Sequence, residues 1–272
     1  MWLLPEWSAV TTPVVGMLHA PPLPGSAGFH GNFEAILRSV LQDAESLRDG
    51  GVDGLMLENF GDAPFYPQRV PRITVAAMTA LAVAVRQRID LPLGINVLRN
   101  DGHSALAIAA VCGAAFIRVN VLCGARVTDQ GLIQGTAHEL LRERAAMGRV
   151  DIGIMADVDV KHSAPLAARP IDVETRELVE RGHADAVVVS GTSTGQPTDA
   201  ASVVAVRQAA NPVPVFVGSG VTAENLAELI RSGAGGLIVG SSIKHDGNLA
   251  APVDPQRVRR LMDAVRSALA GL

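Results

Sequence analysis

The residue types best suited to chemistry stand together in one short segment near the middle of the chain. Residues 152–159 are mostly apolar but contain Asp157 and Asp159, and Lys161 follows two positions later. Side chains alternate between the two faces of a β-strand, so we expect these three groups on one face. A buried carboxylate needs a cation or strong donors, and Lys161 can be that cation. The combination can move a proton to or from a sugar carbon, but a structural ion-pair network uses the same residue types.

Polar side chains also end four other short apolar runs. If their apolar neighbours face outward, five of them point toward a common interior, namely His19, Glu58, Asn96, Arg118 and Asn120. We expect Glu58 to share the catalytic role and the other four to bind substrate. Arg118 can instead be a salt-bridge partner of Glu58 or Asp157. His19 can be a ligand, a base or a hydrogen-bonded residue of the rim.

Two glycine-serine turns indicate an anion site. Gly218-Ser219-Gly220 and Gly240-Ser241-Ser242 each follow a short apolar run. Glycine lets the backbone approach a ligand closely, and the N–H groups at the start of a helix attract negative charge. If the two runs are the last two strands of a barrel, their loops are a frequent place for phosphate. The alternatives are ordinary strand-to-helix turns, or a carboxylate in place of phosphate.

A loop rich in hydroxyl groups follows another apolar run, at residues 190–197. We expect Ser190 and Thr194 in this loop to contact a sugar, or the same phosphate from its other side. Serine, threonine and glycine are also ordinary loop formers, so the segment can instead be a simple connection.

Short β-branched runs alternate with longer helical patterns along the chain. The predicted strands span residues 14–19, 54–59, 93–97, 115–120, 152–159, 186–190, 215–218 and 236–240. Helices are expected near residues 33–49, 75–88, 104–111, 136–147, 172–181, 200–209, 223–232 and 255–270. This alternation favours parallel strands, and eight units indicate an α/β protein with a closed (β/α)8 TIM barrel. We expect one domain over residues 1–272, with the barrel at about 12–270 and loops at 20–32, 60–74 and 122–135 on its catalytic face.

Composition narrows the classes of partner. The net charge is −4, the pI is near 6.0 and 3% of residues are aromatic, so we expect no nucleic-acid partner. The start of the chain lacks a secretory pattern and no apolar run reaches the length of a membrane span, so we expect a cytoplasmic protein. A homo-oligomer is the default for such a barrel. No metal site is predicted, although Asp157, Asp159 or Glu58 can hold Mg2+.

Four motifs together resemble the BtpA/SgcQ family. They span residues 15–25, 54–65, 94–101 and 156–162, and the similarity extends over roughly residues 12–270. The first motif reads VGMLHAPPLPG and the last reads ADVDVKH. The resemblance implies a barrel of the ribulose-phosphate-binding type, in agreement with the strand pattern. It also implies an association with photosystem I biogenesis for the family's namesake, while other members occur in non-photosynthetic bacteria.

These features favour an enzyme that acts on a phosphorylated sugar or a nucleotide-like metabolite. Isomerase, epimerase, lyase and glycosyl-cleaving reactions all fit a phosphate held at the Gly-Ser turns beside the acidic groups and Lys161. The alternative is a non-enzymatic assembly or stability factor of the photosystem I biogenesis type. An assembly factor would tolerate substitutions at the barrel mouth, and an enzyme would not.

Overall fold

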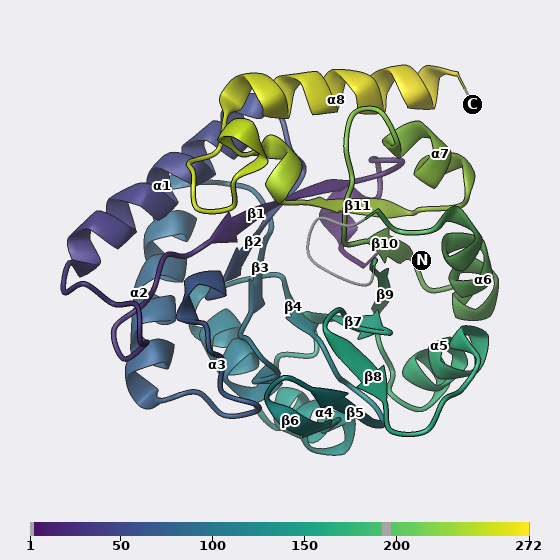
Figure 1. The fold of residues 1–272 in the computed structure, drawn as a ribbon, viewed down its shortest axis with the longest axis horizontal. Helices are drawn as coiled ribbons and strands as arrows, with labels where there is room; N and C mark the ends of the chain where they lie inside the picture. The colour runs from purple at the N-terminus through teal and green to yellow at the C-terminus, as the bar shows by residue number, and fades with distance from the viewer. Residues whose placement is uncertain (1–2, 192–196, 272) are drawn as a thin grey trace.

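The computed structural model describes residues 3–191 and 197–271, and eight of its strands close into a parallel barrel (Figure 1). The strands are β1 (Val14–His19), β2 (Gly54–Glu58), β3 (Leu93–Asn96), β4 (Phe116–Val119), β7 (Gly153–Val158), β9 (Ala186–Val189), β10 (Val215–Val217) and β11 (Gly236–Val239). Neighbours around the ring follow the order of the chain, and β11 pairs with β1 to close it. The predicted strands and the closed (β/α)8 barrel are confirmed.

Eight α-helices of the described residues surround this ring (Figure 1). They are α1 (Phe33–Gly50), α2 (Arg72–Arg88), α3 (Gly102–Cys112), α4 (Ala137–Ala146), α5 (Ile171–Glu180), α6 (Ala200–Ala210), α7 (Leu226–Arg231) and α8 (Pro255–Ala270). The main core lies between helices and strands and includes the fully buried Leu47, Leu81 and Leu106. Burial of this aliphatic layer is what holds the strand ends in one ring.

Turns from helix to strand rest on glycine and aspartate. Gly51, which follows α1, has a φ of 90°, in the left-handed region that glycine enters without a Cβ clash. Two residues later, the Asp53 carboxylate accepts a hydrogen bond from the backbone N–H of Val14 at 2.8 Å. Asp185 accepts one from Ile154 N–H at 2.9 Å in the same way. Each aspartate ties the start of one strand to the turn before the next.

Residues 122–135 form a hairpin, so the prediction of a loop there is wrong. β5 (Ala125–Thr128) and β6 (Gly131–Gln134) pair antiparallel, and β8 (Ser163–Pro165), which follows β7, pairs with β5. Ile133 is buried, whereas Val127 and Leu132 are each 47% exposed. The two strands are too short and too exposed to produce a continuous apolar run in the sequence. Their small sheet lies beside the barrel where β4 and β7 end (Figure 1).

The N-terminal segment fills the amino end of the barrel (Figure 1). The Trp7 ring lies 5.7 Å from that of Phe116 and 5.8 Å from that of Phe216, centroid to centroid. The indole N–H donates to the Asp53 carbonyl at 2.9 Å. Gly94 leaves room for the Phe116 ring, because a Cβ on Gly94 would lie 2.1 Å from a ring carbon. The buried rings of Trp7, Phe116 and Phe216 occupy this end of the lumen, so we expect a ligand at the carboxyl ends of the strands.

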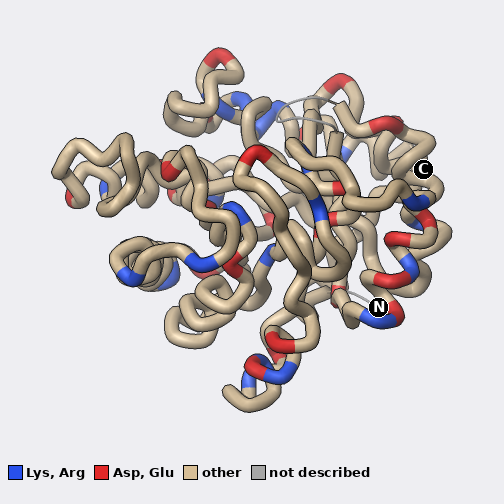
Figure 2. The backbone as a smooth tube through the Cα atoms, turned by 60° about the horizontal axis from the view of Figure 1, so that its bottom comes forward, with Lys and Arg blue, Asp and Glu red and all other residues tan. Residues whose placement is uncertain are grey.

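Charged residues are interspersed over the outer helices, with both signs on the same elements (Figure 2). Within residues 3–191 and 197–271, no helix has the length and apolar character needed to cross a bilayer.

Truncation of Trp7, which plugs the amino end of the barrel, tests how much its packing there contributes to stability. We expect Trp7→Ala to lower the free energy of unfolding by about 3–5 kcal/mol, because it leaves a cavity between two buried phenyl rings. Val111→Ala is the control, since Val111 is 73% exposed and its loss should cost less than about 0.5 kcal/mol. Urea unfolding measures both, and equal effects of the two changes would contradict the plug.

Candidate active site

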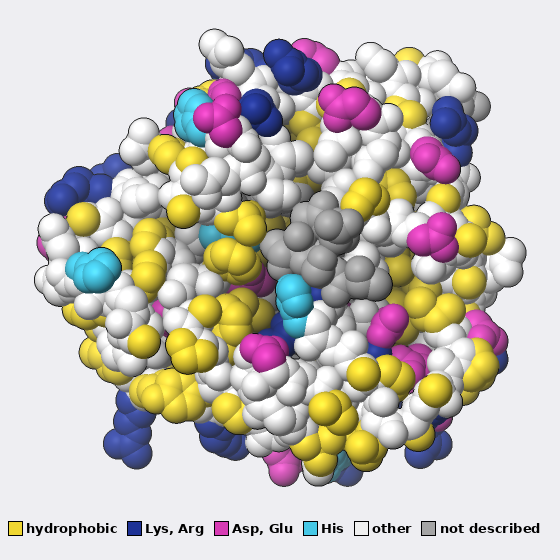
Figure 3. Space-filling model, in the orientation of Figure 1, with side chains coloured by type: hydrophobic (Ala, Val, Ile, Leu, Met, Phe, Trp, Pro, Cys, Tyr) yellow, Lys and Arg dark blue, Asp and Glu magenta, His cyan; other side chains and the backbone are white. Residues whose placement is uncertain are grey.

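Polar side chains from five strands meet at the carboxyl ends of the barrel. Strand register places His19 opposite Glu58, Glu58 opposite Asn96, and Asn96 opposite Arg118. Asp157 enters the same group from β7 by direct hydrogen bonds to Arg118. A space-filling view along the barrel shows histidine and charged side chains near the centre of a largely uncharged face (Figure 3). The period of two in each strand therefore brings these residues into one mouth.

A buried ion pair joins β4 to β7 at this level. Arg118 donates from Nε to Oδ2 of Asp157 at 3.0 Å and from Nη2 to Oδ1 at 2.8 Å. The Asp157 side chain is fully enclosed. Burial lowers the pKa of Arg118, but the Asp157 carboxylate, its hydrogen bonds and Glu58 outweigh burial and leave that pKa raised. Glu58 and Asp157 are the two salt-bridge partners expected for Arg118, and Arg118 pairs with Asp157.

Two asparagines complete this network. Asn120 donates to Oδ2 of Asp157 at 2.8 Å. Asn96 donates to Oδ1 of Asn120 at 3.2 Å and to the Arg118 carbonyl at 3.1 Å. The Asp157 carboxylate thus accepts three side-chain hydrogen bonds, which occupy most of its lone pairs. This arrangement favours an anchoring role for Asp157 over proton transfer.

Lys161 reaches the mouth from the segment that follows β7. Its ammonium donates to the Gly218 carbonyl at 2.9 Å, and no ion pair joins it to a carboxylate within the described part of the chain. Burial lowers the pKa of Lys161 to about 8, with Arg118 adding to the effect and Asp157 and Glu58 opposing it. At about pH 7, Lys161 is therefore a neutral amine in roughly a tenth of the protein molecules.

A histidine and a carboxyl group face each other across β1 and β2. Nε2 of His19 lies 3.7 Å from Oε1 of Glu58, and both side chains are buried. Burial and then three nearby cations lower the pKa of His19 to about 3, so the imidazole is neutral and the contact is no ion pair. Burial also raises the pKa of Glu58, against the opposing charges of Arg118 and Lys161. A carboxyl group that holds its proton closer to neutral pH can act as a general acid.

A small cavity of about 50 Å3 lies between the two glycine turns. Its lining includes most of the predicted anion-binding residues together with three side chains from the mouth: Gly218, Ser219, Gly220, Gly240, Ser241, His19, Arg118 and Lys161. A Cβ on Gly240 would lie 3.0 Å from Cε1 of His19, so the absence of a side chain there keeps the space open. Two cations beside closely approaching backbone suit an anion the size of phosphate or carboxylate.

A larger cavity of about 510 Å3 adjoins the small one. Arg118 and Lys161 line both cavities and therefore stand at their junction. The rest of its wall combines mouth residues with the tip of the β5–β6 hairpin and includes Glu58, Phe60, Phe65, Leu98, Arg99, Asn120, Asp129, Gln130, Val160 and His162. A ligand anchored by an anionic group in the small cavity would extend past Lys161 into this chamber.

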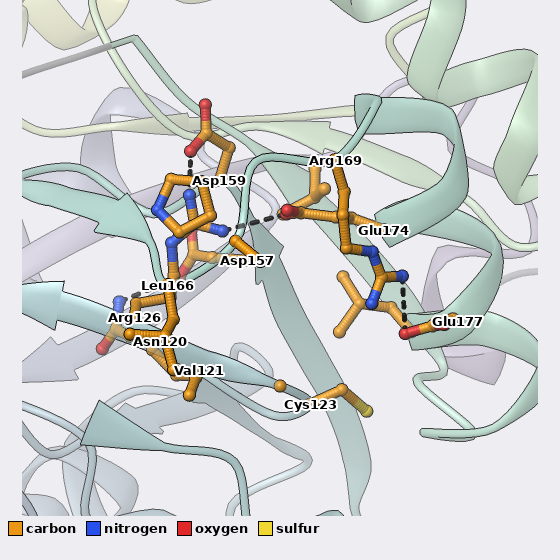
Figure 4. A pocket seen from close by; sticks show the side chains of 16 residues that line it. Asn120, Val121, Cys123, Arg126, Asp157, Asp159, Leu166, Arg169, Glu174 and Glu177 are labelled. Carbon is orange, nitrogen blue, oxygen red and sulfur yellow. Dashed lines mark hydrogen bonds and ion pairs between the residues drawn. The ribbon is translucent and has the colours of Figure 1, made fainter. Parts of the chain in front are cut away.

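Asp159 lies apart from Lys161 and Glu58, and the prediction that it faces the barrel interior is wrong. β7 ends at Val158, and Asp159 has a φ of 51°, so the alternation of faces stops there. Its carboxylate is 59% exposed and pairs with Arg126 of β5, which also binds Glu174 of α5 at 2.9 Å (Figure 4). Asp159 thereby holds the hairpin against the barrel.

A third cavity, of about 230 Å3, lies beside this cluster, between the hairpin and α5. Its charged side chains already have partners, since Arg126 binds two carboxylates and Arg169 binds Glu177 at 2.8 Å (Figure 4). The two mouth cavities are the better candidate for a ligand site, because the Lys161 ammonium that lines them has no carboxylate partner among the described residues.

Two further predicted residues, Ser190 and Ser242, are absent from the lining of the small cavity. Ser190 borders the Gly218 turn, with Oγ 3.1 Å from where a Cβ on Gly218 would lie. Among the described residues, the buried Oγ atoms of Ser190 and Ser242 and Nδ1 of His19 have no hydrogen-bond partner. Buried polar atoms of this kind are available to a ligand. Thr194 lies outside the described residues.

The three carboxylates that the sequence suggests for Mg2+ do not point toward a common site. Asp157 is bonded to Arg118, Asp159 turns to Arg126, and the raised pKa of Glu58 disfavours its charged form. The described part of the chain contains no group of three His, Cys, Asp or Glu side chains placed to hold a metal ion. The donor set does not fit Mg2+, which needs several oxygen ligands around one point.

The sequence pattern does not single out two further cations at the mouth. Arg99, which follows β3, is buried and donates to the Lys161 carbonyl. Lys244 forms a buried ion pair with Asp43 of α1 at 2.6 Å. Asp43 and Lys244 are 201 residues apart, so no local pattern can reveal their pairing. The sequence gives only a weak indication that Arg99 belongs to the site, because Arg99 is a charged residue that closely follows an apolar strand.

Solved structures share this fold. The native KDPGal structure has a TM-score of 0.60 at 16% identity, over 95% of this chain and 96% of that chain. N-(5'-phosphoribosyl)anthranilate isomerase from Pyrococcus furiosus has a TM-score of 0.58 at 14% identity, over 94% and 99%. KGPDC from Streptococcus mutans has a TM-score of 0.59 at 12% identity, over 95% and 99%. At such identities the likeness establishes the fold alone, which is the barrel predicted from the sequence.

Relatives of known sequence match nearly the whole chain. The chain is 47% identical to the photosystem I biogenesis protein BtpA of Synechocystis sp., over 94% of this chain and 89% of that protein. It is 46% identical to an uncharacterized protein of Thermococcus kodakarensis, over 93% and 95%. An uncharacterized mitochondrial protein of Caenorhabditis elegans is 32% identical, over 93% of each chain. Residues 10–267 match the BtpA family, so the chain belongs to the BtpA family.

Proposed function

We propose that this protein is an enzyme that binds a phosphorylated sugar or a nucleotide-like metabolite at the barrel mouth. The observation that carries the proposal is the pair of adjoining cavities, one sized for an anion and one for the body of a metabolite. Arg118 and Lys161 line both, so the anion-binding and reactive parts of the site share a boundary. Barrels of this type frequently hold phosphate in the loops after the last two strands, where Gly218–Gly220 and Gly240–Ser241 lie.

Glu58 and Lys161 supply the two groups that would exchange protons with the substrate. Burial raises the pKa of Glu58 and lowers that of Lys161 to about 8, so both titrate nearer to neutral pH than free side chains. Opposite shifts of this kind suit one acid and one base. The neutral His19 can hydrogen-bond a hydroxyl group without adding charge. Isomerase, epimerase and lyase reactions all need such a pair beside the reacting carbon.

A second candidate is a non-enzymatic assembly or stability factor. The name of the Synechocystis relative, a photosystem I biogenesis protein, favours it. The Caenorhabditis elegans relative matches over 93% of its length, and animals have no photosystem. A role common to both proteins must therefore be more general, and metabolite binding at the mouth meets that condition.

A charge introduced into the small cavity tests the anion site. Ser241→Asp places a carboxylate beside the proposed phosphate, and Ser241→Asn adds a side chain of the same shape without the charge. We expect inorganic phosphate to raise the thermal unfolding midpoint of the wild type by mass action. The Asp variant should bind phosphate about tenfold more weakly than the Asn variant, through like-charge repulsion. If phosphate raises the unfolding midpoint of the two variants equally, the anion site does not lie in this cavity.

The titration of Lys161 predicts a pH dependence for anion binding. The pKa of Lys161 is lowered to about 8, so its positive charge is present below about pH 8 and lost above it. Sulfate is the suitable probe, because its own charge is constant over this range. Its affinity should fall between about pH 7 and about pH 9 in the wild type but stay level in Lys161→Arg. Calorimetric titration measures this, and the same fall in both proteins would exclude Lys161 as the cause.

Removal of the Asp157 charge tests the anchoring role. Asp157→Asn leaves the Arg118 guanidinium buried without its counter-ion, which should cost about 3–5 kcal/mol of unfolding free energy. The double variant Asp157→Asn, Arg118→Met should recover part of that loss, because no unpaired charge is left. Urea unfolding compares the three proteins. An Asp157→Asn protein as stable as the wild type would show that the ion pair is not the anchor.

A further inference from the structure

The chain contains two lysines, Lys161 and Lys244, and both lie at the carboxyl end of the barrel. The other basic side chains are arginines and histidines. Arginine keeps its proton under all ordinary conditions, whereas lysine can lose it and react through nitrogen as a nucleophile. The capacity for amine chemistry outside the chain terminus is therefore confined to two residues at one end of the fold.

The two lysines differ in what surrounds their ammonium groups. Lys244 is 2% exposed, and its ammonium is paired with the Asp43 carboxylate at 2.6 Å. Lys161 donates to the neutral Gly218 carbonyl and forms no ion pair with a carboxylate of the described residues. The neighbouring guanidinium groups of Arg118 and Arg99 disfavour the charge further. Only Lys161 has surroundings that promote a neutral amine.

Lys161 also has the right position for a substrate carbon. Its side chain lines the small cavity between the glycine turns and the larger chamber beyond. Because Nζ contacts the Gly218 carbonyl at 2.9 Å, it lies directly beside the turn that would hold phosphate. The substrate atoms within its reach are those a few bonds from the phosphate group.

We infer that Lys161 captures an open-chain aldose or ketose phosphate as a covalent imine, with the carbonyl group a few bonds from the phosphate. The inference rests on the proposed function, because phosphate in the small cavity is what places the carbonyl carbon beside Nζ. It narrows the substrate to phosphorylated carbonyl compounds.

The step balances without an oxidant, a reductant or a further reactant. The amine of Lys161 attacks the carbonyl carbon and forms a C–N bond, while the protonated carboxyl of Glu58 gives its proton to the carbonyl oxygen. Glu58 recovers a proton from the nitrogen, and the carbinolamine then loses its oxygen with the second amine hydrogen as water. C=O is thus replaced by C=N. Glu58 then passes its proton to the imine nitrogen, the resulting iminium acidifies the C–H bond next to it, and the Glu58 carboxylate so formed can accept that proton.

Borohydride trapping tests the inference directly. The full-length protein is incubated with dihydroxyacetone phosphate or ribose 5-phosphate and sodium cyanoborohydride, and intact-mass spectrometry counts the reduced adducts. We expect one adduct per chain, located by peptide mapping at Lys161. Unphosphorylated dihydroxyacetone should label about tenfold less, because only the phosphate holds the carbonyl beside the amine. Background is low because the second lysine is buried in an ion pair.

Lys161→Arg is the matched control, since it keeps the charge but cannot form an imine. Its adduct should disappear while inorganic phosphate still raises its thermal unfolding midpoint. An adduct that persists in this variant, or that maps to Lys244 or the terminal amine, overturns the inference. So does the absence of any adduct in the wild type with both sugar phosphates. If no adduct forms but phosphate stabilises the wild type, the proposed function stands and only the imine inference fails. If phosphate does not stabilise the wild type either, the proposed function and the imine inference both fail.

The pH dependence of trapping separates Lys161 from an ordinary lysine. The titratable and charged groups that face it are Arg118, Asp157, Glu58 and Arg99. With a pKa of about 8, the neutral fraction of Lys161 rises about tenfold between about pH 7 and about pH 9 and then levels off. An unperturbed lysine would gain about a hundredfold over the same range. A hundredfold rise in the trapping rate would contradict the assignment.

Discussion

The buried ion pair between Arg118 and Asp157 is the interaction on which the geometry of the mouth depends. Two charges so far from water are tolerated because each satisfies the other through two hydrogen bonds, and Asn120 adds a third to the carboxylate. The pair joins β4 to β7, and Asn96 extends the network to β3. Three neighbouring strands are thereby tied together at the level where their apolar cores end.

The same pair determines which lysine has no carboxylate partner among the described residues. Asp157 would be the natural counter-ion of Lys161, but Arg118 occupies its carboxylate. The other lysine, Lys244, has its own carboxylate in Asp43. Lys161 is left with a backbone carbonyl, and burial then lowers its pKa to about 8. Burial of Lys161, together with a charge pairing in the walls of the mouth that leaves it a backbone carbonyl as partner, accounts for this lowered pKa.

The sequence predicts the residues inside strands well and those beyond strand ends poorly. Glu58, Asn96 and Arg118 lie within regular strands, so alternation of faces places them at the mouth. Asp159 follows the last residue of β7, and its positive φ turns the side chain to Arg126. Tertiary contacts fix this backbone conformation, and the alternation of side chains along a strand does not predict it.

Long-range contacts account for the other differences. The eight barrel strands follow from local patterns of apolar residues, and all eight are present. The pairing of Lys244 with Asp43 and the insertion of Trp7 into the barrel join distant parts of the chain, so neither leaves a local pattern. The β5–β6 hairpin is held by β8, by the ion pairs of Arg126 and by the one buried residue Ile133, which packs with Val121 and Val160.

The proposed binding of a phosphorylated metabolite at the barrel mouth is best tested by a crystal structure grown with inorganic phosphate. We expect tetrahedral density in the small cavity, within hydrogen-bond distance of the backbone at Gly218–Gly220 and Gly240–Ser241 and in contact with Arg118 or Lys161. Phosphate found only at crystal contacts, with that cavity filled by water or by the protein's own side chains, would contradict it.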